Sequence, residues 1–181
     1  VARQNPADYV MGMAAAVRAA LGAARALDPS SIRGIAIDAT GSTPIPVDRN
    51  NVPLGMLPEF AGEPDAMAWL WKDHTSHAEA SEITELAKRQ SRPYLAKCGG
   101  VYSSEWYWSK ILRCHRVNPR VAEAAWSWVE FCDWVPAYLC GQTNPGTIRR
   151  SICAAGHKGL YHESWGGLPA AEFLEALHPG L

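Results

Sequence analysis

The chain has 181 residues, 48% of them hydrophobic, which is enough apolar material for the core of one globular domain. Seventeen basic and 18 acidic residues give a formal net charge of -1, without a basic run long enough to follow a phosphate backbone, so no nucleic acid partner is expected. No apolar run approaches the roughly 18 residues that cross a bilayer, and no signal peptide is apparent, so no membrane partner is expected.

The five cysteines are widely spaced and form no Cys-x-x-Cys pair of the kind used by zinc and redox sites. Reduced thiols in a cytoplasmic protein are therefore expected. The chain begins with Val1, only a few residues before a helix start, which favours a piece of a longer protein.

The first segment predicts a helix followed by a strand. Asn5-Pro6 is typical of a helix start, and apolar residues then recur at helical spacing to about Ala26. The apolar run 32–38 predicts a central buried strand. Its carboxyl end leads into the small polar turn 40–43, a common position for a ligand in α/β sheets.

The rest of the chain predicts one hairpin and then mostly helices. Two short extended segments, 43–48 and 52–57, predict a hairpin whose prolines require an edge position. Ser76 and Glu79 form the pattern of a capping box before a helix at 76–89. Further helices are expected at 104–116, 119–128, 130–140 and 169–177. Early strands and late helices predict an α/β fold with helices packed on a small mixed sheet.

One histidine cluster resembles a metal site. In Asp73-His74-x-x-His77 two imidazoles lie three residues apart, and imidazole suits zinc. No further ligands follow at a typical spacing, and the pair straddles the expected helix start. Partly exposed polar residues are the favoured interpretation, and no metal site is expected.

Several other residues have both a functional and a structural interpretation. Three Trp-x-Trp pairs offer aromatic faces to a sugar, but most of these rings are expected to fill the core, with Trp106 the expected exception. Lys158 follows Ala154-Ala155-Gly156, whose small side chains allow close approach to a ligand, although from these residues alone a surface lysine is the favoured interpretation. Arg149-Arg150 could face an acidic ligand or be solvated. Familiar phosphate loops and a serine nucleophile elbow are missing, so these residues alone leave the function open.

A series of short motifs covers nearly the whole chain. They lie at residues 34–44 (GIAIDATGSTP), 57–60 (LPEF), 70–75 (LWKDHT), 99–106 (GGVYSSEW), 132–136 (CDWVP), 148–150 (IRR), 155–158 (AGHK) and 162–169 (HESWGGLP). In this order and spacing they resemble the L-ribulokinases of the FGGY family of carbohydrate kinases. Kinases of glycerol or xylulose share the arrangement of the motifs, but their sequence at the position of the turn 40–43 is different.

The resemblance implies a fold of two ribonuclease H-like (actin-like ATPase) domains, with the sugar bound mainly by the first and ATP by the second. Residues 1–181 would be an incomplete part of the N-terminal sugar-binding domain. The opening strands, with a phosphate-binding turn, would precede Val1. The general-base aspartate and the C-terminal ATP domain would follow Leu181. No catalytic, cofactor-binding or metal-binding residue is therefore expected within the chain.

The activity implied by the resemblance is transfer of the γ-phosphoryl group of ATP, with Mg²⁺, to L-ribulose in L-arabinose catabolism. The ketopentose would be the partner of this chain, which by itself is expected to be inactive and to bind no ATP. Gly41, Ser42 and Lys158 match the sugar-contacting segments, and Glu105 and Trp106 lie on a segment that borders the sugar site. Kinases of another pentulose or polyol, a non-catalytic sugar-binding module and an inactive structural fragment are the alternatives. Association into a homodimer stays open.

Overall fold

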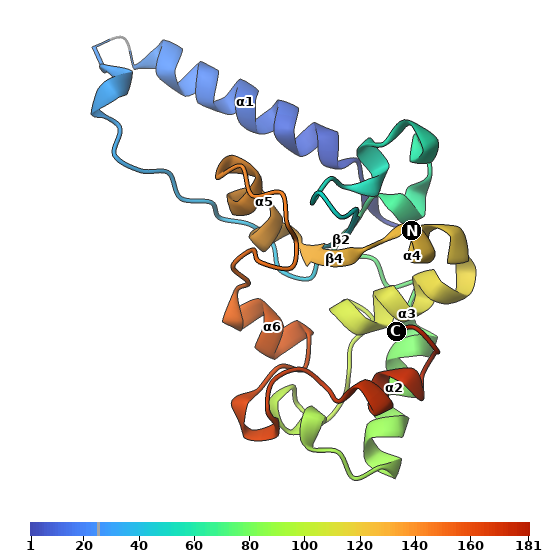
Figure 1. Ribbon diagram of the computed structural model, residues 1–181. Helices are drawn as coiled ribbons and strands as arrows, with labels where there is room; N and C mark the ends of the chain where they lie inside the picture. Colours follow the sequence, from blue (N-terminus) through green and yellow to red (C-terminus); the bar gives the residue numbers. More distant parts are fainter. Residues whose placement is uncertain (25) are drawn as a thin grey trace.

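The computed structural model describes residues 1–24 and 26–181, and these form a mixed α/β structure with short strands (Figure 1). The helices are α1 (Pro6–Ala23), α2 (His77–Arg89), α3 (Tyr107–Val117), α4 (Pro119–Ala124), α5 (Phe131–Leu139), α6 (Ile152–Lys158) and α7 (Ala171–Glu175). The strands are β1 (Arg3–Gln4), β2 (Pro44–Val47), β3 (Ala68–Trp69) and β4 (Ser127–Glu130). Over the described ranges, no helix has the length and apolar character needed to cross a membrane.

The strands form two antiparallel pairs. Strand β2 pairs with β4, from Pro44 opposite Glu130 to Val47 opposite Ser127, and β1 pairs with β3. The expected mixed sheet is therefore wrong for residues 1–24 and 26–181, although the α/β class is confirmed. All four residues of β2 are buried, so this pair lies at the centre of the structure and carries the turn 40–43 at one end.

Two hydrophobic clusters hold the elements together. The larger one joins helices α2, α3 and α4 around side chains such as Ile83, Leu112 and Val121. The smaller one surrounds the β2–β4 pair. Trp69 on β3 meets Trp128 on β4 edge to face, with ring centroids 6.2 Å apart. Each fully buried side chain of this size contributes about 1.5–3 kcal/mol, so the packing fixes β4 between the helices and β2.

Most of the predicted helices are confirmed. Helix α1 begins where expected, since the Asn5 side chain accepts a hydrogen bond from the Ala7 amide at 3.0 Å. Helices at 76–89, 104–116, 130–140 and 169–177 are found as α2, α3, α5 and α7. The capping box is wrong, because the Ser76 hydroxyl instead donates to the Ser104 carbonyl at 2.8 Å.

Two segments form different elements from those predicted. The helix expected at 119–128 ends at Ala124, because residues 127–130 pair with β2 as β4. The second strand of the expected hairpin is also wrong, since Leu54–Met56 forms a 3-10 turn after a single bridge between Val47 and Pro53. At 127–130 the pairing with β2 overrides the local helical pattern.

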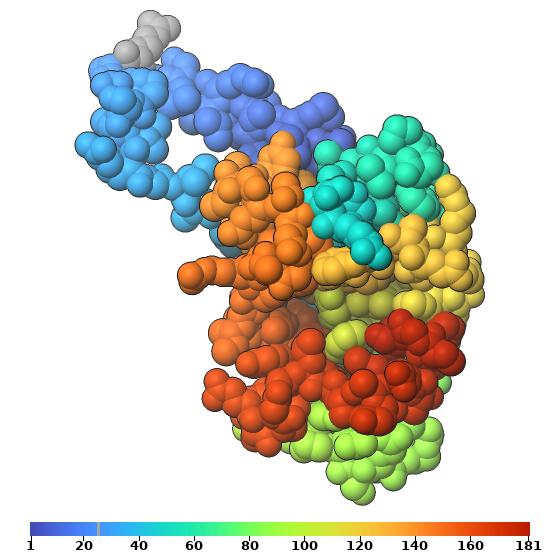
Figure 2. All heavy atoms as spheres, viewed as in Figure 1, coloured from blue at the N-terminus to red at the C-terminus, as the bar shows by residue number. Residues whose placement is uncertain are grey.

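The predicted buried strand at 32–38 is wrong. These residues have no regular secondary structure, and Ile32 and Ile35 are 49% and 64% exposed. A strand needs a neighbour for its backbone hydrogen bonds, and none of the strands in the described residues runs beside this segment. The second half of α1 and residues 26–36 project from the body of the molecule as an extended arm (Figures 1 and 2). The first half of α1 and Ile37 pack against the smaller hydrophobic cluster.

Candidate functional site

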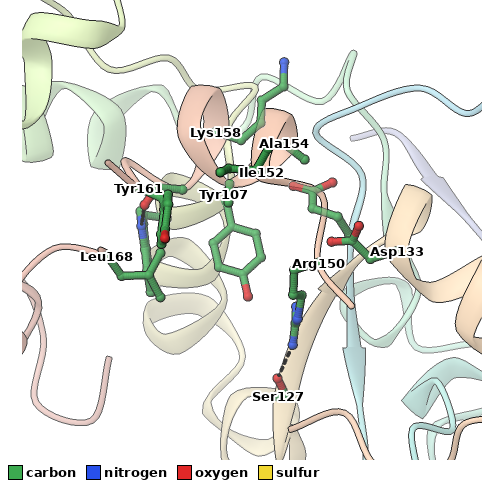
Figure 3. Close-up of a pocket in the computed structure, with 13 residues that line it drawn as sticks. Tyr107, Ser127, Asp133, Arg150, Ile152, Ala154, Lys158, Tyr161 and Leu168 are labelled. Atoms are coloured by element: carbon green, nitrogen blue, oxygen red, sulfur yellow. Dashed lines mark hydrogen bonds between the residues drawn. The ribbon is translucent and has the colours of Figure 1, made fainter. Parts of the chain in front are cut away.

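A cavity of about 550 Å³ lies between α3, β4 and α6. Its lining residues are Tyr107, Trp108, Ser127, Glu130, Asp133, Arg150, Ile152, Ala154, Ala155, Lys158, Gly159, Tyr161 and Leu168. In Figure 3, Asp133 and Arg150 lie on one side of Tyr107, with Tyr161 and Leu168 on the other. Aromatic and aliphatic groups form most of the wall, and the charged lining residues are two acids and two bases.

The start of α6 is fixed by Asp133. The Ser151 amide donates to Asp133 Oδ1 at 2.8 Å, and the Ser151 hydroxyl in turn accepts from the Ala154 amide at 3.4 Å. Burial raises the pKa of the Asp133 carboxyl, and this amide hydrogen bond opposes the shift. Asp133 therefore ties the first turn of α6 to α5.

The end of α6 is held by two aromatic side chains. The Tyr102 hydroxyl donates to the Lys158 carbonyl, and Trp108 Nε1 donates to the Gly159 carbonyl at 2.7 Å. The same Tyr102 oxygen accepts from the Trp108 amide at 2.9 Å. The backbone of Lys158 is thereby fixed while its side chain remains half-buried at the cavity.

Gly41 and Lys158 are brought together by the fold. A Cβ atom at position 41 would lie 3.2 Å from Lys158 Cε, which is tighter than an ordinary van der Waals contact. Glycine thus lets the turn 40–43 approach the stem of the lysine. The next residue, Ser42, is buried with a φ of 63°, and its hydroxyl has no hydrogen-bond partner among the described residues.

Lys110 anchors this turn through its ammonium group. Its Nζ, fully buried, donates to the carbonyls of Ser42 at 2.8 Å, Leu70 at 2.8 Å and Trp69 at 3.4 Å. The three donors of one ammonium group are therefore all engaged. Burial lowers the pKa of Lys110 to about 8, although the nearby Glu130 carboxyl acts in the opposite direction.

Glu130 holds the same turn from β4. The Thr43 amide donates to Glu130 Oε2 at 2.8 Å, and both residues are buried. Burial raises the pKa of Glu130 to about 7, against the opposing effects of the Thr43 amide and Lys110. Its second oxygen, Oε1, is buried and has no protein partner over the described residues.

Glu105 and Trp106 are not among the lining residues of the cavity. Trp106 is only 9% exposed and belongs to the larger core cluster. The prediction that Trp106 lies outside the core is therefore wrong. Its ring meets His157 edge to face, with centroids 4.9 Å apart, and His157 precedes Lys158 on α6. Glu105 Oε1 lies 3.8 Å from His74 Nε2 at the surface. Direct contact of either residue with a ligand stays a prediction.

The candidate metal cluster forms other contacts. The Asp73 carboxyl pairs with Arg3 and accepts from Thr75, while His74 and His77 are exposed. Within residues 1–24 and 26–181, no group of three or more histidine, cysteine or acidic side chains is arranged to hold a metal ion.

Sequence reasoning missed Glu130 and Lys110 and left Arg150 open. Arg150 donates to the Trp128 carbonyl at 2.8 Å and lines the cavity. A signal for Lys110 existed, because it lies four residues from both Trp106 and Cys114 on one helix face, and those two side chains are buried. For Glu130 the signal was a carboxyl directly after the apolar pair Trp128-Val129.

The sequence matches no family model. It is 48% identical over 180 residues to a ribulokinase of Vibrio parahaemolyticus, 36% identical over 180 residues to one of Bacillus licheniformis, and 34% identical over 179 residues to one of Mycolicibacterium smegmatis. Each match covers 99% of this chain. The resemblance to the ribulokinases is confirmed. The chain spans 32%, 31% and 30%, respectively, of the length of these ribulokinases.

Replacing Lys110 by methionine is predicted to destabilise the fold. The Ser42 and Trp69 carbonyls would lose their side-chain donor, at about 1–3 kcal/mol for each group left unsatisfied. The Leu70 carbonyl would keep the Asp73 amide, and removal of a buried charge offsets part of the loss. We expect the free energy of unfolding to fall by about 2–4 kcal/mol in urea denaturation. The control is Lys88→Met, at an exposed lysine on α2. Equal stability of both variants would contradict an anchoring role for Lys110.

Proposed function

We propose that this chain is the sugar-binding part of a kinase that transfers the γ-phosphoryl group of ATP to L-ribulose. The observation that carries the proposal is the similarity to ribulokinases along 99% of the chain. The motif at 155–158, which ends in Lys158, lies within the match and at the cavity. The proposal places residues 1–181 in the N-terminal sugar-binding domain of a cytoplasmic protein.

The cavity has the chemistry that a neutral polyhydroxy ligand requires. Its aromatic and aliphatic wall suits the CH groups of a sugar, and its charged groups can donate to or accept from hydroxyls. The two acids Glu130 and Asp133 and the two bases Arg150 and Lys158 balance in formal charge at the cavity. A strongly charged ligand would gain little from this arrangement.

The 181 residues do not fit Mg²⁺ and ATP. Magnesium in phosphoryl-transfer sites is held by carboxylates and phosphate oxygens, and the described part of the chain offers no cluster of three or more acidic, histidine or cysteine side chains for a metal. The sequence also contains no glycine-rich phosphate loop. In the proposed function these residues bind and orient the sugar, and the remaining two thirds of the protein supply the nucleotide site and the general base.

The proposed fold is part of a ribonuclease H-like domain. The exposed, extended segment 32–38 supports it, because its apolar residues would be buried if strands from elsewhere in the protein paired with it. In that arrangement the turn 40–43 would lie at the carboxyl end of a sheet strand, where α/β folds bind ligands.

The test of the proposed function is a substrate panel on the full-length protein. With Mg²⁺ and ATP, we expect the highest kcat/KM for L-ribulose, and lower values for D-xylulose, L-xylulose and glycerol. A higher kcat/KM for another pentulose or polyol would identify that compound, and not L-ribulose, as the substrate. Sugar binding without phosphorylation of any panel member would instead favour a non-catalytic sugar-binding module.

Lys158→Met is predicted to weaken recognition of the sugar. An ammonium bound to a sugar hydroxyl in a partly desolvated cavity contributes about 1.5–3 kcal/mol, so kcat/KM for the ketose should fall by at least about tenfold. Methionine keeps the length of the stem, so the KM for ATP and the melting temperature should change little. The matched control is Lys88→Met on α2. Unchanged kcat/KM in Lys158→Met would show that Lys158 is only a surface residue.

A polypeptide of these 181 residues is predicted to bind ATP negligibly. Its described residues provide no suitable metal cluster, and its sequence contains none of the familiar phosphate loops. Isothermal titration calorimetry with Mg·ATP should therefore show no saturable heat, whereas the full-length protein should bind. Micromolar binding to the shorter polypeptide would place a nucleotide site within this chain.

A further inference from the structure

Glu130 is a buried acid in which one carboxyl oxygen is hydrogen-bonded to the protein and the other is not. Its side chain lies at the end of β4 and lines the cavity, and the residue is only 5% exposed. Oε2 accepts from the Thr43 amide, whereas Oε1 has no partner over residues 1–24 and 26–181. A buried polar atom without a partner costs about 1–3 kcal/mol, so such atoms usually face a ligand or an ordered water.

The neighbouring basic groups do not satisfy Oε1. Lys110 has all three of its ammonium donors on the carbonyls of Ser42, Trp69 and Leu70. Arg150 donates to the Trp128 and Pro145 carbonyls and to the Ser127 hydroxyl. None of the ion pairs found in the described residues includes Lys158. Oε1 is therefore without a basic protein partner, and it belongs to a residue that lines the cavity.

The surroundings of Oε1 favour a hydroxyl group as that partner. A hydroxyl can donate to the carboxylate and, through its own lone pairs, accept from an ammonium such as Lys158. Burial raises the pKa of Glu130 to about 7, while the Thr43 amide, Lys110 and Lys158 oppose this rise and Asp133 adds to it. Above about pH 7 most of the carboxyl is ionised, and Oε1 can then accept a hydrogen bond from a hydroxyl.

We propose that Glu130 binds one hydroxyl of the ketose through Oε1 and thereby helps to select the sugar. This inference rests on the proposed function, and it assigns a specificity-determining contact to a residue that the sequence motifs did not indicate. Because Oε2 holds Thr43, Glu130 also couples the turn 40–43 to the bound sugar: the same carboxyl contacts the ligand and the backbone beside Gly41 and Ser42.

Glu130→Gln in the full-length protein tests the contact. Glutamine keeps the volume and can still accept from the Thr43 amide, but its NH₂ group then replaces the free oxygen and cannot accept. At about pH 8, where most of the wild-type carboxyl is ionised, the KM for L-ribulose should rise by at least about tenfold. The KM for ATP should not change. The matched control is Glu85→Gln, an exposed acid on α2, which should leave both KM values unchanged.

A series of monodeoxy analogues of L-ribulose shows whether a hydroxyl is the partner. One analogue should lose about tenfold or more in kcat/KM with the wild-type protein and lose little with Glu130→Gln, because the contact is already removed. Equal losses in both proteins for every analogue would overturn the proposal, as would an unchanged KM in Glu130→Gln.

The remaining outcomes are also decisive. If Glu130→Gln does not fold, Glu130→Asp is tested instead, because it keeps the charge and shortens the side chain by one methylene. This variant should raise the KM for the ketose and not the KM for ATP. An unchanged KM for the ketose overturns the proposal. If the wild-type protein does not phosphorylate L-ribulose, the proposed function fails first. In that case the same variants and analogues are compared by calorimetric sugar binding, and equal affinities would reject the Glu130 contact.

Discussion

The buried ammonium of Lys110 is the interaction on which the site depends. It brings the Ser42 carbonyl of the turn 40–43 together with the Trp69 and Leu70 carbonyls at the end of β3. These segments are distant in the sequence, and within the described residues Lys110 on α3 donates a hydrogen bond to all three carbonyls. A methionine has no donors for these carbonyls and a glutamine amide has two, so the three carbonyls favour the three donors of a lysine despite the cost of burying its charge.

The cost of this arrangement is shared between two residues of opposite charge. Burial disfavours the ionised form of both Lys110 and Glu130, and each opposes the shift of the other. Both side chains hold the turn 40–43, one through the Ser42 carbonyl and the other through the Thr43 amide. The backbone next to Gly41 is thus fixed from two sides, and this allows Lys158 to pack against it without obstruction.

Much of this structure follows from local sequence patterns, and the rest depends on contacts that such patterns cannot contain. The Asn5 cap and the helical spacing after it predict α1, and the sequence resemblance predicts Gly41 and Lys158 at one site, where the fold brings them close together. The roles of Glu130 and Lys110 were not predictable in the same way, because each depends on backbone groups brought close by tertiary packing. The segment 32–38 shows the opposite case, in which a strand-like pattern forms no strand because none of the strands found in residues 1–24 and 26–181 lies beside it.

The arm also bears on how a polypeptide limited to these residues behaves in concentrated solution. Residues 32–38 alternate or run apolar in an extended backbone, with Ile32 and Ile35 open to solvent. The backbone amides and carbonyls of such a segment can form hydrogen bonds with the same segment of another molecule, which creates an intermolecular β-ladder. Arg33 and Asp38 are the charged side chains within the segment. They oppose a parallel, in-register pairing of two copies, because that pairing would place like charges beside each other. Self-association of this kind is favoured by high salt, which screens those two charges.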